Sequence, residues 1–567
     1  MEANAKYDEK PWLRFYPEQV PATVDVPERS LPDVFDEVSA KYADKTAIIF
    51  YGNKIRFKQL REDVDRFATA LHDLGIRKGD KVALYLLNSP QYVIAYFGAL
   101  KAGATVTPIS PVYTSIEVKH QLEDSEATTI VCQDFLHENV ERAGASLKNV
   151  ILTDIGKYLP FSKRLIGKSS LGRYAKMEAP SQKVIESRGF HQFQKLLQKY
   201  PPNPPRIEFD PKEDIAVLPY TGGTTALPKG AVLTHHNLLA CQMQMLAFLP
   251  VYEEGKEVVP ALLPFYHIYG QVVVMLNGLI LGSTLILFTT PDLDEVLSAM
   301  TRYGATVFYS VPTAYQFLKD YDKTERFNWK GLKILTSGAD TLHQSTIDDW
   351  ERRTGAKIQE GYGLTECSAV SHLNPLGRSK VGSFGVPLPN ISAAVIDPET
   401  HEFVPPGEIG EMLISGPNVM KGYWKRPEET RSTLIQLEGR TWLRTGDLVR
   451  MDDEGYFFFY DRMKDMIKYK GYSVFAREIE EVLHRHPQVK AAGVVGVPDP
   501  NVGQMIKAIV VLQTEARGKV SEEEMMQYCA ENLAHYKVPK TIEFRGELPK
   551  TDVGKVSHRE LREELDD

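Results

Sequence analysis

The N-terminal part of the chain alternates short apolar runs with amphipathic helical patterns, and the connections between them are short. An apolar run at 81–87 is followed by a helical pattern at 92–101 and by a second apolar run at 105–109. A strand, a helix and a second strand joined in this way form a parallel sheet that is covered on both faces. The pattern recurs at 130 and at 150–152. The sequence therefore predicts an α/β, doubly wound fold.

Length and composition narrow the protein class. A chain of 567 residues is too long for one hydrophobic core, so we expect two or more domains. Its 67 basic and 75 acidic residues give a net charge of −8, which argues against bulk binding to nucleic acid. The cysteines show no CxxC spacing, which indicates reduced thiols without a metal. They are Cys132, Cys241, Cys367 and Cys529.

The sequence indicates a cytoplasmic protein. The first six residues are polar and lack the apolar core of a signal peptide. The most apolar run, 271–288, contains polar residues and is interrupted by Gly282 and Ser283. A buried helix followed by a strand fits this run better than a membrane span.

The segment 220–230 reads Tyr-Thr-Gly-Gly-Thr-Thr-Ala-Leu-Pro-Lys-Gly and follows a strand-like run at 215–218. Backbone amides and hydroxyls of such a loop suit polyphosphate, and the lysine balances charge. It is not a Walker A loop, because Pro228 precedes Lys229 and the required spacing is absent. A Thr-rich surface turn is the alternative. The candidate phosphate ligands are Thr221, Gly222, Gly223, Thr224, Thr225 and Lys229.

A second motif, Gly-Tyr-Gly-Leu-Thr-Glu, occupies 361–366. Tyr362 can stack on a purine, while Gly361 and Gly363 let the backbone approach a ligand. Thr365 can bind a phosphate oxygen, and Glu366 is a hard oxygen ligand for Mg²⁺. A purely structural Gly-Tyr-Gly turn is the alternative.

Together these motifs resemble those of the adenylate-forming superfamily, which holds acyl-CoA synthetases, peptide-synthetase adenylation domains and firefly-type luciferases. Gly222 stands where the superfamily commonly has Ser, and Ala226 stands where Gly is common. The resemblance implies a large N-terminal domain at 1–462, made of doubly wound α/β subdomains and a small β unit. It also implies a small, mobile α+β C-terminal domain at 463–567.

The resemblance assigns further residues of the N-terminal domain. Thr221 and Glu366 would hold Mg²⁺ with ATP, and His267 would lie at the mouth of the acyl pocket. Asp447 suits a ribose diol, since a carboxylate accepts from two hydroxyls. The other nucleotide-binding candidates follow a predicted strand or precede the domain boundary: Gly338, Ala339, Asp340 and Arg462.

In the C-terminal domain, the resemblance makes Lys464 the hinge. It implies that Lys468, Lys470 and Gly471 form a face that serves thioester formation with coenzyme A. Lys555 would reach across the domain gap to the reacting carboxylate and the α-phosphate, although an isolated lysine near a C-terminus is normally solvated. The implied catalytic residues are Lys555, Thr365, Glu366 and His267.

The segment 155–177 holds six Lys and Arg residues and no acidic residue, among apolar side chains. Such a segment can lie on anionic lipid, and a solvated surface loop is the alternative. It resembles an insertion of bacterial and archaeal long-chain fatty acyl-CoA synthetases. We therefore expect a cytoplasmic protein that associates with the inner face of the membrane. A homodimer is a further expected assembly.

The predicted activity is that of an ATP-dependent acyl-CoA synthetase with ATP, Mg²⁺ and coenzyme A. A carboxylate attacks the α-phosphorus of ATP, and the thiol of coenzyme A then displaces AMP. Medium- to long-chain fatty acids are the favoured substrates. The alternatives are an aryl-acid (4-coumarate-like) CoA ligase, a luciferase-like oxygenase and a stand-alone adenylation enzyme, while a nucleotide-binding regulator would not need both Lys229 and Lys555.

Overall fold

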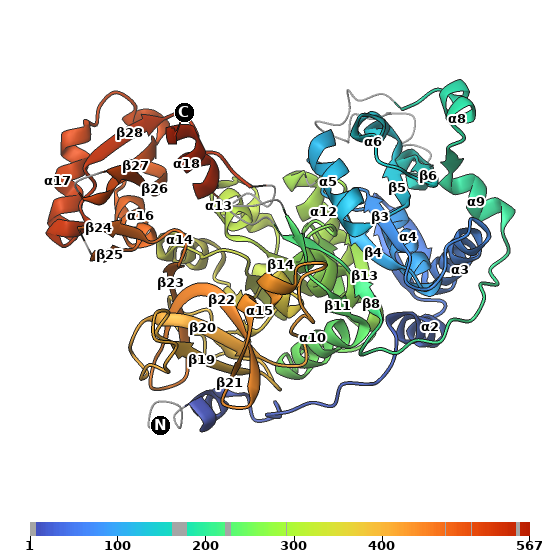
Figure 1. Ribbon diagram of the computed structural model, residues 1–567, viewed down its shortest axis with the longest axis horizontal. Coiled ribbons are helices and arrows are strands. Elements are labelled where there is room, and N and C mark those ends of the chain that lie inside the picture. The colour runs from blue at the N-terminus through green and yellow to red at the C-terminus, as the bar shows by residue number, and fades with distance from the viewer. Residues whose placement is uncertain are drawn as a thin grey trace.

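The computed structural model shows a large N-terminal body and a small C-terminal body side by side (Figure 1). Buried hydrophobic side chains up to Phe457 and those from Ile467 onward belong to separate clusters. The boundary predicted between 462 and 463 falls between these clusters and stays a prediction. The structure describes residues 7–160, 179–221, 228–290, 292–470, 472–499, 502–551 and 556–566.

The first sheet of the large body has seven strands, parallel except for β11 at one edge. Its order is β11 (Leu233–Thr234), β8 (Ile215–Val217), β4 (Thr105–Pro108), β3 (Lys81–Tyr85), β5 (Thr129–Gln133), β6 (Asn149–Thr153) and β7 (His191–Gln192). Its helices are α3 (Phe57–Asp73), α4 (Pro90–Lys101), α5 (Ser115–Ser125), α6 (His137–Ala143), α8 (Gln182–Arg188) and α9 (Phe193–Lys199). Ser89 caps α4 by accepting a hydrogen bond from the amide of Tyr92, and Pro90 begins the helix.

The second sheet has four strands and lies against helices that carry much of the apolar sequence. Its order is β12 (Val258–Ala261), β13 (Thr284–Leu287), β1 (Thr46–Phe50) and β2 (Asn53–Arg56). The accompanying helices are α2 (Leu31–Lys41), α10 (His235–Phe248), a π-helix (Tyr269–Leu276) and α11 (Asn277–Ile280). A π-helix of this length is rare, and such segments are frequent at functional sites.

The third sheet supplies the strand ends on which the site is built. Its first three strands are parallel and the last two antiparallel. They are β14 (Val307–Ser310), β15 (Ile334–Ser337), β16 (Gln359–Tyr362), β17 (His372–Leu373) and β18 (Val386–Pro387). Helices α12 (Leu293–Tyr303), α13 (Pro312–Asp320) and α14 (Gln344–Thr354) belong to this part.

An antiparallel β unit completes the large body. It contains β19 (Ser392–Ile396), β20 (Gly410–Ser415), β22 (Arg440–Met451), β21 (Leu434–Leu437) and β23 (Phe457–Arg462), with α15 (Pro427–Thr433) beside it. The N-terminal segment reaches this side of the molecule (Figure 1). The Tyr7 hydroxyl donates to the carbonyl of Val404 in this unit, and the Tyr16 hydroxyl donates to the carbonyl of Pro387 on β18 of the third sheet.

The small body is an α+β unit with a five-stranded sheet. Its strands are β25 (Tyr472–Val474), β24 (Ile467–Tyr469), β27 (Gly503–Leu512), β26 (Val489–Asp499) and β28 (Thr541–Arg545). Its helices are α16 (Ala476–Arg485), α17 (Glu522–Asn532) and α18 (His558–Asp566).

The predicted fold class is confirmed, and one predicted element differs in detail. The helix predicted at the start of the run 271–288 is π-helical over most of its length before α11 and β13 follow.

We expect Trp350→Ala to destabilise the large body by ~3–5 kcal/mol, because it empties a packed aromatic site. Trp350 is 0% exposed, with its ring centroid 4.7 Å from that of Trp329. Urea unfolding of the purified protein measures the loss. Phe317→Ala on α13 is the control, since Phe317 is 66% exposed and should change stability by less than ~0.5 kcal/mol. Equal effects of the two substitutions would contradict this packing.

Candidate active site

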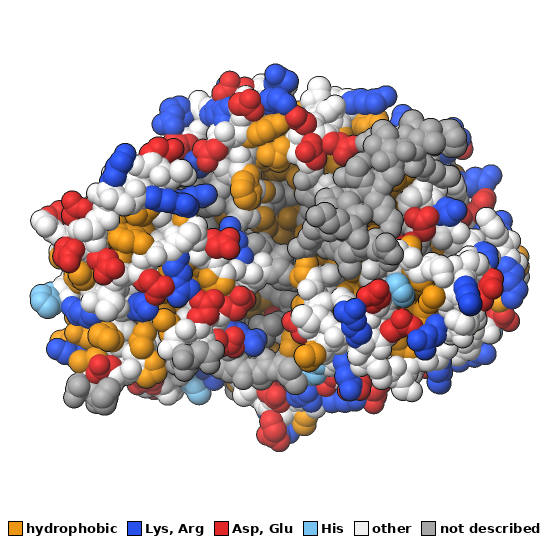
Figure 2. All heavy atoms as spheres, turned by 90° about the horizontal axis from the view of Figure 1, so that it is seen from above, with side chains coloured by type: hydrophobic (Ala, Val, Ile, Leu, Met, Phe, Trp, Pro, Cys, Tyr) orange, Lys and Arg blue, Asp and Glu red, His pale blue; other side chains and the backbone are white. Residues whose placement is uncertain are grey.

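A cavity of about 750 Å³ lies where the ends of β15 and β16 meet the β unit. Strands of a parallel sheet commonly present ligand-binding loops at their carboxyl ends. Seen from above, the surface is hollowed near its middle, beside the C-terminal body, and hydrophobic side chains line part of the hollow (Figure 2). The predicted site residues that line the cavity are Thr221, Lys229, His267, Gly338, Ala339, Gly361, Tyr362, Gly363, Thr365, Glu366, Asp447, Arg462 and Lys464.

Other predicted residues lie elsewhere. Asp340, Lys468 and Lys470 are described by the structure but are not among the residues that line the cavity. The phosphate-loop residues 222–225, together with Gly471 and Lys555, lie outside the described residues. Thr551, four residues before Lys555, does line the cavity and comes from the C-terminal body.

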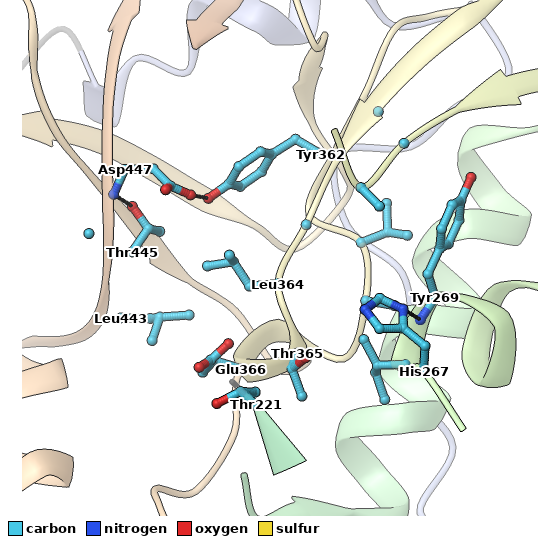
Figure 3. Close-up of a pocket in the computed structure, with 18 of the residues that line it drawn as sticks. Thr221, His267, Tyr269, Tyr362, Leu364, Thr365, Glu366, Leu443, Thr445 and Asp447 are labelled. Carbon is cyan, nitrogen blue, oxygen red and sulfur yellow. Dashed lines mark hydrogen bonds between the residues drawn. The ribbon is translucent and has the colours of Figure 1, made fainter. Parts of the chain in front are cut away.

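One end of the cavity is built around Asp447. The Tyr362 hydroxyl donates to Oδ2 of Asp447 at 2.5 Å, and Nε of Arg462 lies 3.5 Å from Oδ1 (Figure 3). Asp447 on β22 pairs directly with Arg462 on β23, so the backbone register sets this ion pair. Burial, together with the neighbouring carboxylate, raises the pKa of Tyr362 far above its ordinary value, so the phenol remains a donor. Burial beside Arg462 lowers the pKa of Lys464 to about 8.

The Gly-Tyr-Gly motif continues into a tight turn. A Cβ added at Gly363 would lie 1.8 Å from the carbonyl oxygen of Ala369. Ser368 and Ala369 have positive φ angles of 57° and 92°, and Ala339 across the cavity has φ of 72°. Left-handed backbone at residues other than glycine is costly and is concentrated at functional sites. The turn therefore holds Thr365 and Glu366 at the cavity by a backbone shape that a larger residue at 363 would disturb.

Lys229, Tyr423 and Glu366 form a polar corner of the cavity. The Tyr423 hydroxyl donates to Oε1 of Glu366 at 2.7 Å, while Nζ of Lys229 lies 4.5 Å from the Tyr423 ring centroid. Thr221 and Thr365 lie close to Glu366 in Figure 3. Among the described residues there is no group of three His, Cys, Asp or Glu side chains able to hold a metal. One carboxylate with hydroxyls fits Mg²⁺, which keeps waters and takes substrate phosphates as its remaining ligands.

Both ends of the phosphate loop are fastened to α5. The Tyr220 hydroxyl donates to Asp124 at 2.7 Å, and Nε2 of His120 donates to the Pro228 carbonyl at 3.0 Å. Arg426 pairs with the same Asp124 at 3.0 Å. These contacts fix where the loop leaves and re-enters the sheet.

The opposite end of the cavity is apolar. Met245 and Leu249 come from α10 and its end, Val273 from the π-helix, Tyr309 from β14 and Val370 from the turn after Glu366. All five are at most 8% exposed. This pouch can take a hydrocarbon group and excludes water from it. His267 borders the cavity with Nδ1 accepting from the amide of Tyr269 at 3.3 Å (Figure 3).

Several residues of the site carried no sequence signal. Tyr423 and Asp124 belong to no motif and join the phosphate loop only through the fold. Glu411 is 2% exposed, and its carboxylate accepts from Arg444 at 2.6 Å and from the amide of Gly446 at 3.1 Å. It thereby braces the turn before Asp447, across 33 residues of sequence.

A family model described as "AMP-binding enzyme" matches residues 35–424. The model of the C-terminal domain of AMP-binding enzymes matches residues 478–555. The chain belongs to the AMP-binding enzyme family. The predicted superfamily is therefore confirmed.

This AMP-binding enzyme has full-length relatives. It is 39% identical over 559 residues to a long-chain-fatty-acid–CoA ligase of Bacillus subtilis, covering 98% of each chain. It is 31% identical to the 4-coumarate–CoA ligase-like 9 of Oryza sativa, covering 97% of this chain and 95% of the relative. ATP-bound MatB from Rhodopseudomonas palustris superposes with a TM-score of 0.81 at 28% identity, covering 95% and 99% of the chains. Apo MatB, also 28% identical and covering 95% and 99%, gives 0.68.

We expect Gly363→Ala to lower kcat/KM for ATP at least about tenfold, because the methyl group must displace the backbone at Ala369. A strain of ~1.4 kcal/mol in the transition state lowers kcat/KM tenfold. Steady-state kinetics at varied ATP measures the loss. Gly546→Ala is the control, since an added Cβ there meets nothing within 4 Å. Unchanged ATP kinetics in Gly363→Ala would contradict the tight-turn interpretation.

Proposed function

We propose that this AMP-binding enzyme is an ATP-dependent fatty acid–CoA ligase that acts on medium- to long-chain fatty acids. The observation that carries the proposal is a single cavity with two unlike ends. Lys229, Glu366 and Asp447 line the polar end, while Met245 and Val273 line the apolar pouch. The predicted class, an AMP-forming acid–thiol ligase, is confirmed by the family and by the full-length relatives. The named activity of the Bacillus subtilis relative supports a fatty acid as the acyl substrate.

In the first half-reaction a carboxylate oxygen of the acid attacks the α-phosphorus of ATP, and pyrophosphate leaves. Asp447 accepts from the ribose hydroxyls and Arg462 fixes that carboxylate, while Tyr362 lies against the base. Lys229 and the hydroxyls of Thr221 and Thr365 bind the polyphosphate. When bound at Glu366, Mg²⁺ neutralises phosphate charge. Preorganised donors and cations stabilise the charge that develops in the transition state.

In the second half-reaction the sulfur of coenzyme A attacks the acyl carbonyl, and AMP leaves. We propose that Lys555 serves only the first half-reaction and that a rotation about Lys464 brings the face with Lys468, Lys470 and Gly471 to the site. Thr551 lines the cavity, whereas Lys468 and Lys470 are not among its described lining residues. This placement fits the arrangement for the first half-reaction.

The proposal extends to association with membranes and with a second copy of the chain. Each cation near an anionic membrane contributes about 1 kcal/mol, and salt screens it. Most of the basic segment 155–177 lies outside the described residues. Within the part of the chain that the structure describes, no helix is both long and apolar enough to cross a membrane. We propose peripheral binding at the inner face of the membrane through this segment, and a homodimer in solution.

An aryl acid is the competing substrate class, and the Oryza sativa relative favours it. We expect coenzyme A-dependent AMP release to be fastest with fatty acids of medium to long chain and at least about tenfold slower with cinnamates. A cinnamate buries less apolar surface, and each ~1.4 kcal/mol of lost burial slows the rate tenfold. A pyrophosphate- and AMP-release screen over chain length and aryl acids measures this. A preference for cinnamates would assign the aryl-CoA ligase function instead.

We expect Glu366→Gln to weaken the use of Mg²⁺-ATP while carboxylic-acid binding changes little, because an amide keeps the shape but loses the charge that a hard cation prefers. Adenylation rates over a Mg²⁺ titration measure the effect. Tyr423→Phe is the matched control, since it removes the hydroxyl that donates to Glu366 and leaves the carboxylate charge. Normal adenylation by Glu366→Gln at all Mg²⁺ concentrations would remove Glu366 from the metal site.

A further inference from the structure

Helix α16 links the C-terminal body to the large body at both of its ends. At its start, the amide of Arg477 donates to Oδ2 of Asp461 at 3.3 Å, and Nη1 of Arg477 donates to the Phe459 carbonyl at 3.3 Å. At its other end, the imidazole of His484 packs on that of His343, with centroids 4.1 Å apart and planes 36° apart. The two contacts are about two helical turns apart along α16.

The two contacts differ in their distance from the proposed pivot. Phe459 and Asp461 lie on β23, five and three residues before Lys464, so this contact is close to the proposed pivot along the chain. His343 precedes α14 and has no chain connection to the pivot nearby. The His343–His484 contact must therefore separate when the domain rotates, as an interface away from a hinge does.

The position of α16 is transmitted to Thr551, which lines the cavity. Glu480 on α16 pairs with Nε2 of His558 at 2.6 Å, and His558 begins α18. Two residues before His558, Val556 forms an antiparallel bridge with Lys550, the neighbour of Thr551. Fixing α16 on the large body thus fixes where Thr551 is presented to the cavity.

We propose that the packed pair His343 and His484 is the docking contact that holds the C-terminal domain in the arrangement for the first half-reaction. The two histidines are positioning residues, because they act through the position of Thr551 and do not line the described cavity. The inference rests on the proposed function, since it assigns the contact to one of two alternating arrangements.

The chemistry of the pair fits a contact that can be made and broken. Burial lowers the pKa of both imidazoles from the ordinary 6.5 to about 4, so both are neutral when docked at neutral pH. Released imidazoles with ordinary pKa values bind protons below about pH 6.5, so docking weakens as pH falls from 6.5 toward 4. The charged groups that surround the pair are Asp340, Glu360, Arg477, Glu480 and Glu481.

Glu360 titrates in the opposite sense to the histidines. Burial raises the pKa of Glu360 to about 7, so the docked arrangement favours the protonated carboxyl. The free energy that this protonation contributes to docking is lost as pH rises toward 7. A pH profile of the native enzyme alone therefore mixes both effects. Substitution at His484 separates them, because Glu360 remains in the variant.

The decisive experiment cross-links the pair and measures each half-reaction by single turnover. In His343→Cys/His484→Cys, a short thiol-specific linker should leave acyl-adenylate formation intact. It should slow coenzyme A attack on supplied acyl-adenylate at least about tenfold, or ~1.4 kcal/mol. The free cysteines Cys132, Cys241, Cys367 and Cys529 are buried, and the two single-cysteine variants treated with linker are controls. Loss of the first half-reaction, or no loss of the second, would overturn the proposal.

Point variants test the same contact without a linker. His484→Ala should slow adenylate formation about tenfold and leave coenzyme A attack unchanged. His484→Phe should keep the ring contact and the rate, and should lose the part of the pH dependence below 6.5 that comes from His484, while the part from His343 remains. His535→Ala, at an exposed histidine of the same body, is the control. Equal slowing of both half-reactions by His484→Ala would show a merely structural role. If the native enzyme formed no acyl-adenylate at all, the proposed function itself would fail.

Discussion

The architecture depends on one buried carboxylate, Asp447, whose partners come from separate parts of the large body. Its side chain is 4% exposed, so its charge needs compensation. Tyr362 reaches it from the third sheet, and Arg462 from the strand that leads to the C-terminal domain. The junction between the third sheet and the β unit, the proposed nucleotide contact and the start of the proposed hinge thus share one ion pair. A ligand that binds Asp447 acts on all three at once.

Local pattern was sufficient for most of the fold. The strands at Lys81–Tyr85 and Thr105–Pro108 and the helix at Pro90–Lys101 follow from their apolar runs and helical pattern. The π-helix at Tyr269–Leu276 did not follow from it, because a fully apolar run has no face by which α- and π-periods could be told apart.

Within the site, the predictable residues are those in ordered motifs, such as Lys229 and Glu366. The residues that escaped prediction act on them from a distance in sequence: Tyr423 is 57 residues from Glu366, and Arg426 is 302 residues from Asp124. No periodicity or spacing links such pairs, since only the packing of separate sheets brings them together. The histidine pair between the bodies is of the same kind. Motifs therefore identify the chemistry, while the contacts that hold it in place belong to the three-dimensional structure.

The π-helix that walls the apolar pouch has a consequence for how the pocket can change through evolution. A π-helical turn contains more residues than an α-helical turn. Deleting one residue from Tyr269–Leu276 can restore an α-helical turn, so the deletion is absorbed within the wall. It would rotate the side chains that face the pouch, Val273 among them, while β13 and the strands around it keep their register. Related enzymes can thus acquire a pouch of different shape by a single-codon deletion, with the polar end of the cavity unaltered.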